Sequence, residues 1–508
     1  MFWTAPSMPR TKSASATRLW PGNVRRKSRQ ALQLAEPNVN VYHRTYPETR
    51  DRSNQAIKRW KDPSAASTTR LAAVVACCGQ FVAFTLEVLN MFKKLALVGV
   101  AVGALGAGSA FAACTTTIGG VMSLTGSLGV LGQKIAQGSE LAIADLNSAG
   151  GANGCDLKLS LLDDQTSPSV GVDAAKKLVD VQQVPAIIGA LSSGVSAAIL
   201  TAVTAPGKVV QISPASTSPT FTELAEQGKT GGYWFRTTPS DALQGVAMAK
   251  VAHDAGFKKV AILYLNNAYG QGLSKEFASG FTGLGGSVTQ NVVYNPSQPS
   301  YRSEVNKALS PAPDALFLIG YPGDGTTIAR EWIAAGGPQK FLLPDGLESQ
   351  DFVNDVGAQY MKDVHGTAAG SSKTPSLATF QSEYQAKFGS LPTQAYIPNA
   401  YDATVLVGLA MEQSRSNKAQ GIRDGMRKVT DPKGEKIYAG VAELKKAAQL
   451  LSQGKTIQYI GASGPLQFDK NGDVDAPMLV WGVSADGKVQ PTGMVTVEQI
   501  AALRKQAK

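Results

Sequence analysis

Short apolar runs alternate with stretches of helical periodicity over residues 115–343, and the alternation comes in two series. Predicted strands of the first series are 115–123, 157–163, 186–190 and 209–212. Those of the second series are 260–265, 288–294, 316–319 and 341–343. The predicted helices between them are 132–149, 169–181, 195–205, 271–281, 301–309 and 326–335. Such alternation indicates parallel sheets flanked by helices, and two series predict two α/β lobes.

Beyond Val364 the periodicity becomes mostly helical. The predicted helices there are 376–388, 395–413, 418–429 and 441–451, and two late strands follow at 466–469 and 477–483. A helix-rich block that follows the second sheet has to pack against one of the lobes. If it returns to the first lobe, the chain crosses between the lobes more than once.

The first 90 residues differ in composition from the rest of the 508-residue chain. They contain 14 Lys and Arg against 5 Asp and Glu, and they lack sustained periodicity, which is typical of disorder. Residues 91–112 then have the three parts of a secretory signal peptide, namely a basic start, an apolar run and the small-residue signal Ala110-Phe111-Ala112. We therefore expect Met91 to be the true initiator and residues 1–90 to be an over-translated or disordered basic extension.

Two other interpretations of the basic extension stay open. The stretch 71–89 is apolar enough to be considered a membrane span, although Gln80, Glu87 and its short length argue against one. A nucleic-acid-binding arm would explain the charge, but no aromatic or fold-level signal accompanies it. The formal net charge of +11 belongs mostly to residues 1–112, so we expect no nucleic-acid partner for the exported protein.

Two of the four cysteines, Cys114 and Cys155, lie beyond the predicted signal peptide. Each begins a predicted strand, and strands joined by one helix are normally neighbours. Export to an oxidising compartment would let these two thiols form a disulfide. Lipid modification of Cys114 is the alternative, although the aliphatic residue usual three places before such a cysteine is missing.

Hydroxyl-rich turns follow three predicted strands between residues 190 and 241. Ligands of parallel α/β sheets bind beyond the carboxyl ends of the strands, where the following helices present free N–H groups. Ser193 and Thr217 therefore suit an anion, and Asp241 suits a cation. Together they predict a site for an amino acid, whereas singly each hydroxyl is more readily explained as a helix cap.

Tyr269 and Asp345 also lie just beyond predicted strands. They could cover a ligand with a ring and add a second carboxylate, or they could be ordinary turn residues.

Motifs for catalysis, nucleotides and metals are missing from the sequence. The predicted mature chain contains only two histidines, His253 and His365, which are too few to make a zinc cluster or a Ser-His-Asp triad a reasonable expectation. The glycines at 126–132 miss the dinucleotide-binding spacing, and the acidic run at 469–475 lacks the Gly and Glu of a calcium loop. We therefore expect neither an enzyme nor a cofactor nor a metal site.

The chain resembles the periplasmic branched-chain amino acid (Leu/Ile/Val) binding proteins, the substrate-binding components of ABC transporters, over residues 113–508. Six segments carry the resemblance: IGGVMSLTG at 118–126, IIGALSS at 187–193, ISPAST at 212–217, RTTPSD at 236–241, AYGQG at 268–272 and FDKNGD at 468–473. Each segment is a weak signal alone, but their order and spacing are specific.

The resemblance implies the type I periplasmic binding protein fold, an α/β fold of two Rossmann-like lobes with parallel sheets, three interlobe crossovers and the ligand between the lobes. Lobe 1 is expected to comprise 113–238 plus 368–472, and lobe 2 to comprise 239–367 plus 473–508. The implied function is a monomeric periplasmic receptor that captures an amino acid, closes by a hinge and delivers the ligand to an inner-membrane ABC permease.

The resemblance also implies ligand-binding roles. Residues matching Ser193 and Thr217 hold the ligand carboxylate with help from the backbone near Ala215, and the residue matching Asp241 takes the ammonium group. Further candidates are Tyr269 as a cover, Asp345 as a second partner of the ammonium, and Tyr321 and Tyr401 as wall residues. Leu131 stands where many members carry an aromatic side chain, and Asp345 is shorter than the usual Glu.

Two other functions compete with this one. A sensor of the same fold could bind an amide, a urea or an aromatic acid and signal to a regulator. An α/β enzyme that uses a cofactor would need a nucleophile–base pair or a phosphate-binding loop, and neither is present.

Overall fold

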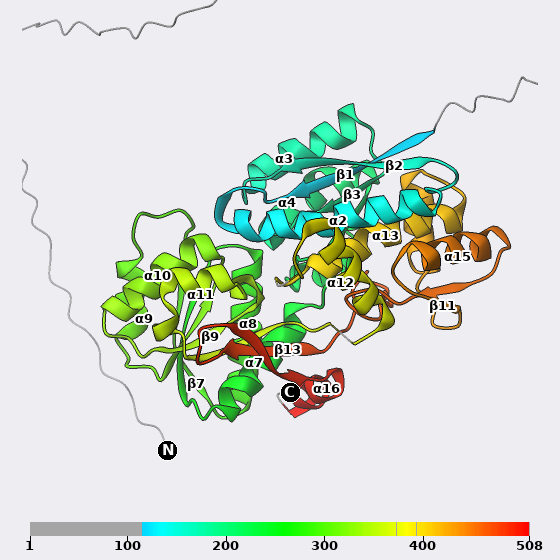
Figure 1. Ribbon diagram of the computed structural model, residues 1–508. Helices are drawn as coiled ribbons and strands as arrows, with labels where there is room; N and C mark the ends of the chain where they lie inside the picture. Colours follow the sequence, from blue (N-terminus) through cyan, green and yellow to red (C-terminus); the bar gives the residue numbers. More distant parts are fainter. Residues whose placement is uncertain (1–113, 372, 393, 507–508) are drawn as a thin grey trace, which may run out of the picture. The chain divides into compact units, whose positions relative to one another are not determined.

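The computed structural model describes residues 114–506 apart from 372 and 393 (Figure 1). The predicted basic extension (1–90) and signal peptide (91–112) lie outside these residues, as does the possible membrane span at 71–89. In the part that is described, no helix has the length and apolar character that crossing a membrane would require.

The first predicted series of strands forms a five-stranded parallel sheet with the order β2-β1-β3-β4-β5. Its strands are β1 (Thr115–Met122), β2 (Asp156–Asp163), β3 (Ala186–Gly189), β4 (Val210–Ser213) and β5 (Trp234–Arg236). The segments between them contain η1 (Gly126–Leu128), α2 (Gly129–Ala149), α3 (Pro168–Lys176), η2 (Lys177–Val181), α4 (Ser193–Ile199), η3 (Leu200–Thr204), α5 (Ala205–Gly207) and α6 (Thr220–Glu226). Strands β3 and β4 are buried along their whole length, as expected for a sheet covered on both faces.

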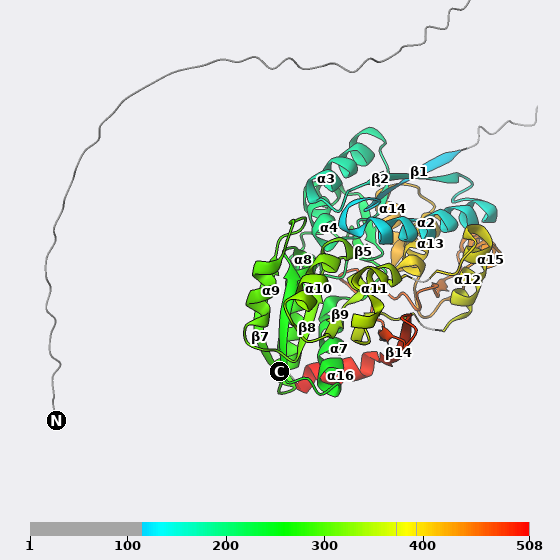
Figure 2. The same cartoon turned by 60° about the vertical axis from the view of Figure 1, so that its left-hand side comes forward.

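The second series forms a seven-stranded mixed sheet with the order β14-β13-β10-β9-β8-β6-β7. Its strands are β6 (Lys259–Leu265), β7 (Ser287–Tyr294), β8 (Ala315–Ile319), β9 (Lys340–Leu343), β10 (Asp363–Ala369), β13 (Met478–Val483) and β14 (Val489–Val495). The accompanying helices are α7 (Asp241–Asp254), α8 (Ala268–Gly283), α9 (Arg302–Leu309), α10 (Pro322–Ala334), η4 (Asp345–Leu347), α11 (Gln350–Val356), η5 (Ala358–Tyr360) and α16 (Val497–Gln506). Helix α16 (red) lies beside α7 (green) in both ribbon views, so the end of the chain packs on this sheet's helices (Figure 2).

The four helices predicted beyond Val364 are confirmed, but two strands of this sheet were missed and one predicted strand was wrong. Strand β10, which was missed, pairs with both β9 and β13. The edge strand β14 was not predicted, because Pro491 and Gly493 break its apolar pattern. The predicted strand at 466–469 is irregular, since Asp469 instead closes a local turn in which its side chain accepts the N–H groups of Asn471 and Asp473.

The helix-rich block packs against the helices of the first sheet. It contains α12 (Pro375–Phe388), α13 (Ile397–Ser414), α14 (Ala419–Met426), β11 (Glu435–Ile437), α15 (Val441–Ser452) and β12 (Ile457–Tyr459). Helix α13 packs directly on α2, where Ser139 Oγ donates to Ala400 O at 3.3 Å and a side chain at Gly138 would clash with Ile397 O. The chain therefore passes between the two sheets three times, after β5, after β10 and before β13, as predicted for this fold.

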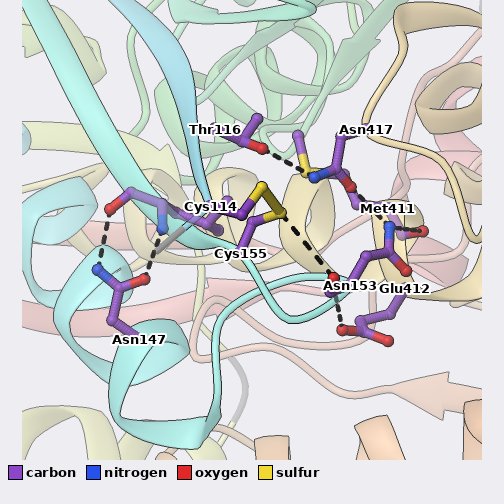
Figure 3. The surroundings of a disulfide bond; sticks show 9 residues. Cys114, Thr116, Asn147, Asn153, Cys155, Met411, Glu412 and Asn417 are labelled. Carbon is purple, nitrogen blue, oxygen red and sulfur yellow. Dashed lines mark hydrogen bonds between the residues drawn. A yellow bond between two sulfur atoms is a disulfide. The ribbon is translucent and has the colours of Figure 1, made fainter. Parts of the chain in front are cut away.

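The predicted disulfide between Cys114 and Cys155 is confirmed, with the two Cα atoms 4.5 Å apart (Figure 3). It joins the starts of β1 and β2, the outermost pair of strands in the first sheet. Asn147 of α2 also binds the edge strand β2, because its side chain both donates to Leu157 O and accepts from Leu157 N. Pairing with Cys155 occupies the thiol that lipid modification of Cys114 would need.

Candidate ligand-binding site

A pocket lies where residues beyond the strand ends of the first sheet meet residues beyond the strand ends of the second. Its empty volume is about 410 Å³, open solvent at the mouth included. The lining residues are Leu128, Leu131, Ile135, Leu191, Ser193, Ala215, Tyr269, Tyr321, Asp345, Gly346, Ala395 and Tyr396. A concave, mainly apolar pocket with a few convergent polar groups is typical of small-molecule sites.

Six of the nine residues proposed from the sequence line this pocket: Leu131, Ser193, Ala215, Tyr269, Tyr321 and Asp345. Of the other three, Tyr401 lies elsewhere, and Thr217 and Asp241 do not line the pocket but are buried next to residues that do. Their backbones are joined, because Asp241 N donates to Thr217 O at 2.8 Å.

Asp241 is buried without a hydrogen-bond partner for either carboxylate oxygen among the described residues. Thr217 Oγ1 likewise has none. Burial raises the pKa of Asp241 well above its usual range, and the negative charge of Asp345 raises it further. A buried, unpaired carboxylate is costly, so this position favours a cationic partner.

Asp345 differs from Asp241 because both of its oxygens are paired. Tyr269 donates to Oδ1 at 2.9 Å, and Tyr396 donates to Oδ2 at 2.7 Å. Burial raises the pKa of Asp345, and the hydrogen bonds from Tyr396 and Tyr269 oppose that rise. The ring of Tyr269 is stacked on that of Tyr321, with centroids 5.6 Å apart, so the two tyrosines form one aromatic wall.

A third acid, Glu348, lies at the end of the short helix η4 that carries Asp345. Burial raises the pKa of Glu348 to about 8, and the charge of Asp345 contributes in the same direction. The second-sheet side of the site is therefore rich in carboxyl groups that are expensive to ionise without a cation.

The hydroxyl groups on the first-sheet side do not cap helices, which was their alternative role. Ser193 is the first residue of α4, and its Oγ accepts from Ser218 N at 3.3 Å. Thr217 precedes the start of α6 at Thr220 and bonds no helix N–H. The Ser193 hydroxyl hydrogen therefore stays available to an acceptor. The Thr217 hydroxyl makes no hydrogen bond of normal length, but it lies near enough to Asp241 to oppose the rise in the pKa of that carboxyl group.

The backbone near Ala215 is partly engaged within its own turn. Ser213 Oγ accepts from Ala215 N at 3.3 Å and from Ser216 N at 2.9 Å. The Ala215 N–H bond is the longer of the two, so this amide is the more readily shared with a ligand.

Two residues that organise the pocket and its surroundings were not predicted. Tyr396 lies just before α13 in the left-handed region, with φ of 70°, and no predicted strand precedes it. Arg236 is completely buried, and its Nη1 donates to Thr217 O at 2.8 Å and to Ser218 O at 2.9 Å. The position of Arg236 at the end of an apolar strand was the one sequence feature that could have indicated a buried, paired arginine.

One weaker candidate was wrong. Tyr401, proposed for the pocket wall, donates instead to Asp145 Oδ2 at 2.7 Å and accepts from Gly440 N at 3.1 Å, because α13 turns this face toward α2. The acidic run at 469–475 has a structural role, since Asp473 pairs with Arg236 Nε at 2.7 Å. In the described residues, no group of three or more His, Cys, Asp or Glu side chains is placed to hold a metal ion.

Comparison with known proteins places these features in context. A family model described as "Periplasmic binding protein" matches residues 115–488. A Leu/Ile/Val-binding protein homolog 2 from Brucella abortus is 30% identical over 404 residues, 78% of this chain and 98% of that protein. The chemotactic signal transduction system substrate-binding protein BasB from Halobacterium salinarum is 28% identical over 68% of this chain and 82% of its own length.

Among solved structures, the leucine binding protein LivK from Thermotoga maritima superposes with a TM-score of 0.64. It is 26% identical and covers 75% of this chain and 99% of its own. The relatives and the fold are those of substrate-binding proteins, not of enzymes.

Proposed function

The chain belongs to the periplasmic binding protein family, and we propose that it captures an amino acid, branched-chain or related, for an ABC importer. The observation that supports the proposal most strongly is that an unpartnered carboxylate and an unpartnered hydroxyl lie beside one pocket. Asp241 is a buried carboxylate without a partner, and the hydroxyl of Thr217, whose carbonyl bonds the Asp241 backbone, has none either. An α-amino acid carries an ammonium group for the carboxylate and a carboxylate for the hydroxyl.

Each end of the ligand has a proposed partner. The hydroxyls of Ser193 and Thr217 donate to the α-carboxylate, assisted by the backbone at Ala215. Asp241 accepts from the α-ammonium group, with Asp345 as a second negative charge. These groups replace the hydration that the charged ends of the ligand lose on binding.

The ligand side chain points toward an aliphatic wall. Four residues supply it: Leu128, Leu131, Ile135 and Leu191. No charged side chain belongs to this group, so a charged ligand side chain would lose its hydration without compensation. Tyr269 and Tyr321 cover the ligand from the second-sheet side.

Capture leads to delivery by closure of the two lobes, 113–238 plus 368–472 and 239–367 plus 473–508. The closed, ligand-loaded monomer then docks on an inner-membrane permease after export to the periplasm by residues 91–112. The Leu/Ile/Val-binding and LivK relatives support an importer, whereas the name of BasB assigns that protein to chemotaxis. No cofactor enters this cycle.

Calorimetry with three ligands of one shape tests the proposal. We expect L-leucine to bind the full-length chain, and we expect both 4-methylpentanoate, which lacks the ammonium group, and L-leucinamide, which lacks the carboxylate, to bind at least about a hundredfold more weakly. Equal binding of 4-methylpentanoate would contradict the role of Asp241. If no amino acid binds while amides or aromatic acids do, the chain is a receptor of the same fold for that other class.

A further inference from the structure

Ser127 makes a polar contact between the two sides of the protein that does not involve the pocket lining. This residue lies in η1, after the first strand of the first sheet, and its Oγ donates to Asp324 Oδ2 at 3.0 Å. Asp324 belongs to the first turn of α10, which follows β8 of the second sheet. Neither residue lines the pocket.

The loop that carries Ser127 is held firmly by its own side of the protein. Asp163, at the end of β2, accepts from Leu124 N at 2.9 Å and from Thr125 Oγ1 at 2.6 Å. Gly126 has a φ of +79°, and a Cβ there would lie 2.3 Å from Gln165 O, so the turn requires glycine. The position of Ser127 is therefore fixed without help from the second sheet.

Asp324 is held just as firmly by the opposite side. Its Oδ1 accepts from Ser297 N at 2.9 Å and from Tyr301 Oη at 2.8 Å, and its side chain is buried. These two bonds leave Oδ2 directed at Ser127.

Gly323 lets the two backbones approach. A Cβ at this position would lie 3.0 Å from Ser127 Cα and 3.3 Å from Ser127 Cβ, closer than ordinary side-chain packing permits. A second close approach joins α4 to α8, where a Cβ at Gly194 would lie 3.3 Å from Asn267 Cβ. Glycine at position 323 therefore leaves Ser127 in place, whereas a larger residue would have to displace it by a few tenths of an ångström.

We propose that Ser127, Gly323 and Asp324 form an interlobe latch that stabilises the closed form and so sets ligand affinity without touching the ligand. Because each half is ordered by its own lobe, the contact gains its energy with little ordering cost. A contact made only in the closed form shifts the open–closed equilibrium and thereby the apparent affinity. The inference rests on the proposed function only in requiring that a ligand bind between the lobes.

Affinity measurements on two variants test the latch. We expect Ser127→Ala, which removes the hydrogen bond to a carboxylate, and Gly323→Ala, which adds the obstructing Cβ, each to weaken L-leucine binding by about tenfold. The melting temperature of the ligand-free protein should stay unchanged, because the contact belongs to the closed form. Gly493→Ala is the matched control, since a Cβ on that β14 glycine meets no atom closer than 3.8 Å. Wild-type affinity in both variants would overturn the latch.

Disulfide trapping gives a test that needs no ligand. The test uses the double variant Ser127→Cys/Gly323→Cys, made in a chain that also carries Cys77→Ser and Cys78→Ser. A Cβ at position 323 would lie 3.3 Å from the Cβ of residue 127, within a few tenths of an ångström of the Cβ–Cβ separation in a disulfide. We expect non-reducing mass spectrometry to show the cross-link in the full-length chain, with L-leucine binding slowed when it is formed. If the cross-link does not form, the two loops do not meet in solution and the latch is wrong. If it forms but wild type does not bind L-leucine, the latch stands and the proposed ligand fails.

Discussion

The residues that follow strands of the first sheet bring one hydroxyl, that of Ser193, and aliphatic side chains to the pocket, whereas those that follow strands of the second sheet bring one carboxyl group, that of Asp345, and two tyrosines. Ser193 and Leu191 follow β3, and Leu131 lies on α2, which follows β1. Asp345 and Tyr321 follow β9 and β8, and Tyr269 begins α8 after β6. One side can hold an anion and an apolar group, and the other a cation.

This division explains why a ligand that carries both charges would favour closure. A group that binds one side alone gains nothing from bringing the other side near, because a ligand shifts an equilibrium only by its differential affinity for the two states. An amino acid held as proposed would contact both sides, so its binding energy would be available in full only when the two sides meet. We therefore expect changes on the two sides to affect different ends of the ligand.

The largest effect on ligand affinity is expected when the two aspartates are substituted one at a time. Asp241→Asn removes the unpaired carboxylate, and truncating one member of a buried ion pair costs about 2–5 kcal/mol, roughly thirtyfold or more in Kd. Asp345→Asn should cost only a few-fold, because both of its oxygens already have tyrosine partners. Isothermal titration with L-leucine measures both, and circular dichroism checks that each variant folds. Equal losses in the two variants would show that the acids act as one unit.

A smaller effect is expected from the aliphatic wall. Leu131→Trp fills space at the apolar end, and overpacking of this kind typically costs about 1–3 kcal/mol, so L-leucine should bind about tenfold more weakly while L-alanine is affected less. Val130→Trp is the matched control, because Val130 is the neighbouring α2 residue, is 56% exposed and does not line the pocket. Uniform weakening of both amino acids by Leu131→Trp would place the ligand side chain elsewhere.

Much of the fold could be predicted from periodicity, because parallel strands buried on both faces leave clear apolar runs such as β3 and β8. Strand β10 was missed because its Gly and Ala residues leave only a weak apolar pattern. In the site, residues directly beyond strand ends were found from their position alone. Tyr396 follows no strand, so local pattern gave no sign of it. The Arg236–Asp473 pair joins residues 237 positions apart, a contact that only the folded chain creates.

The smallest effect expected is a release of protons on binding. Burial and the charge of Asp345 raise the pKa of Asp241, and a ligand ammonium group would lower it again. Binding should therefore release up to about one proton, and affinity should fall as pH falls through the raised pKa, by at most about tenfold per pH unit. Calorimetry in two buffers of different ionisation enthalpy measures the release.

Glu348→Gln is the control for this measurement, because the pKa of Glu348 is also raised, to about 8, although it does not line the pocket. Proton release that persists in Glu348→Gln assigns the proton to the Asp241 side of the site. Release that disappears in this variant would assign it to Glu348 instead. Binding without proton exchange from pH 5 to 8 would mean that Asp241 is ionised before the ligand arrives. The hydroxyl groups of the first-sheet side would then have to account alone for selectivity toward amino acids.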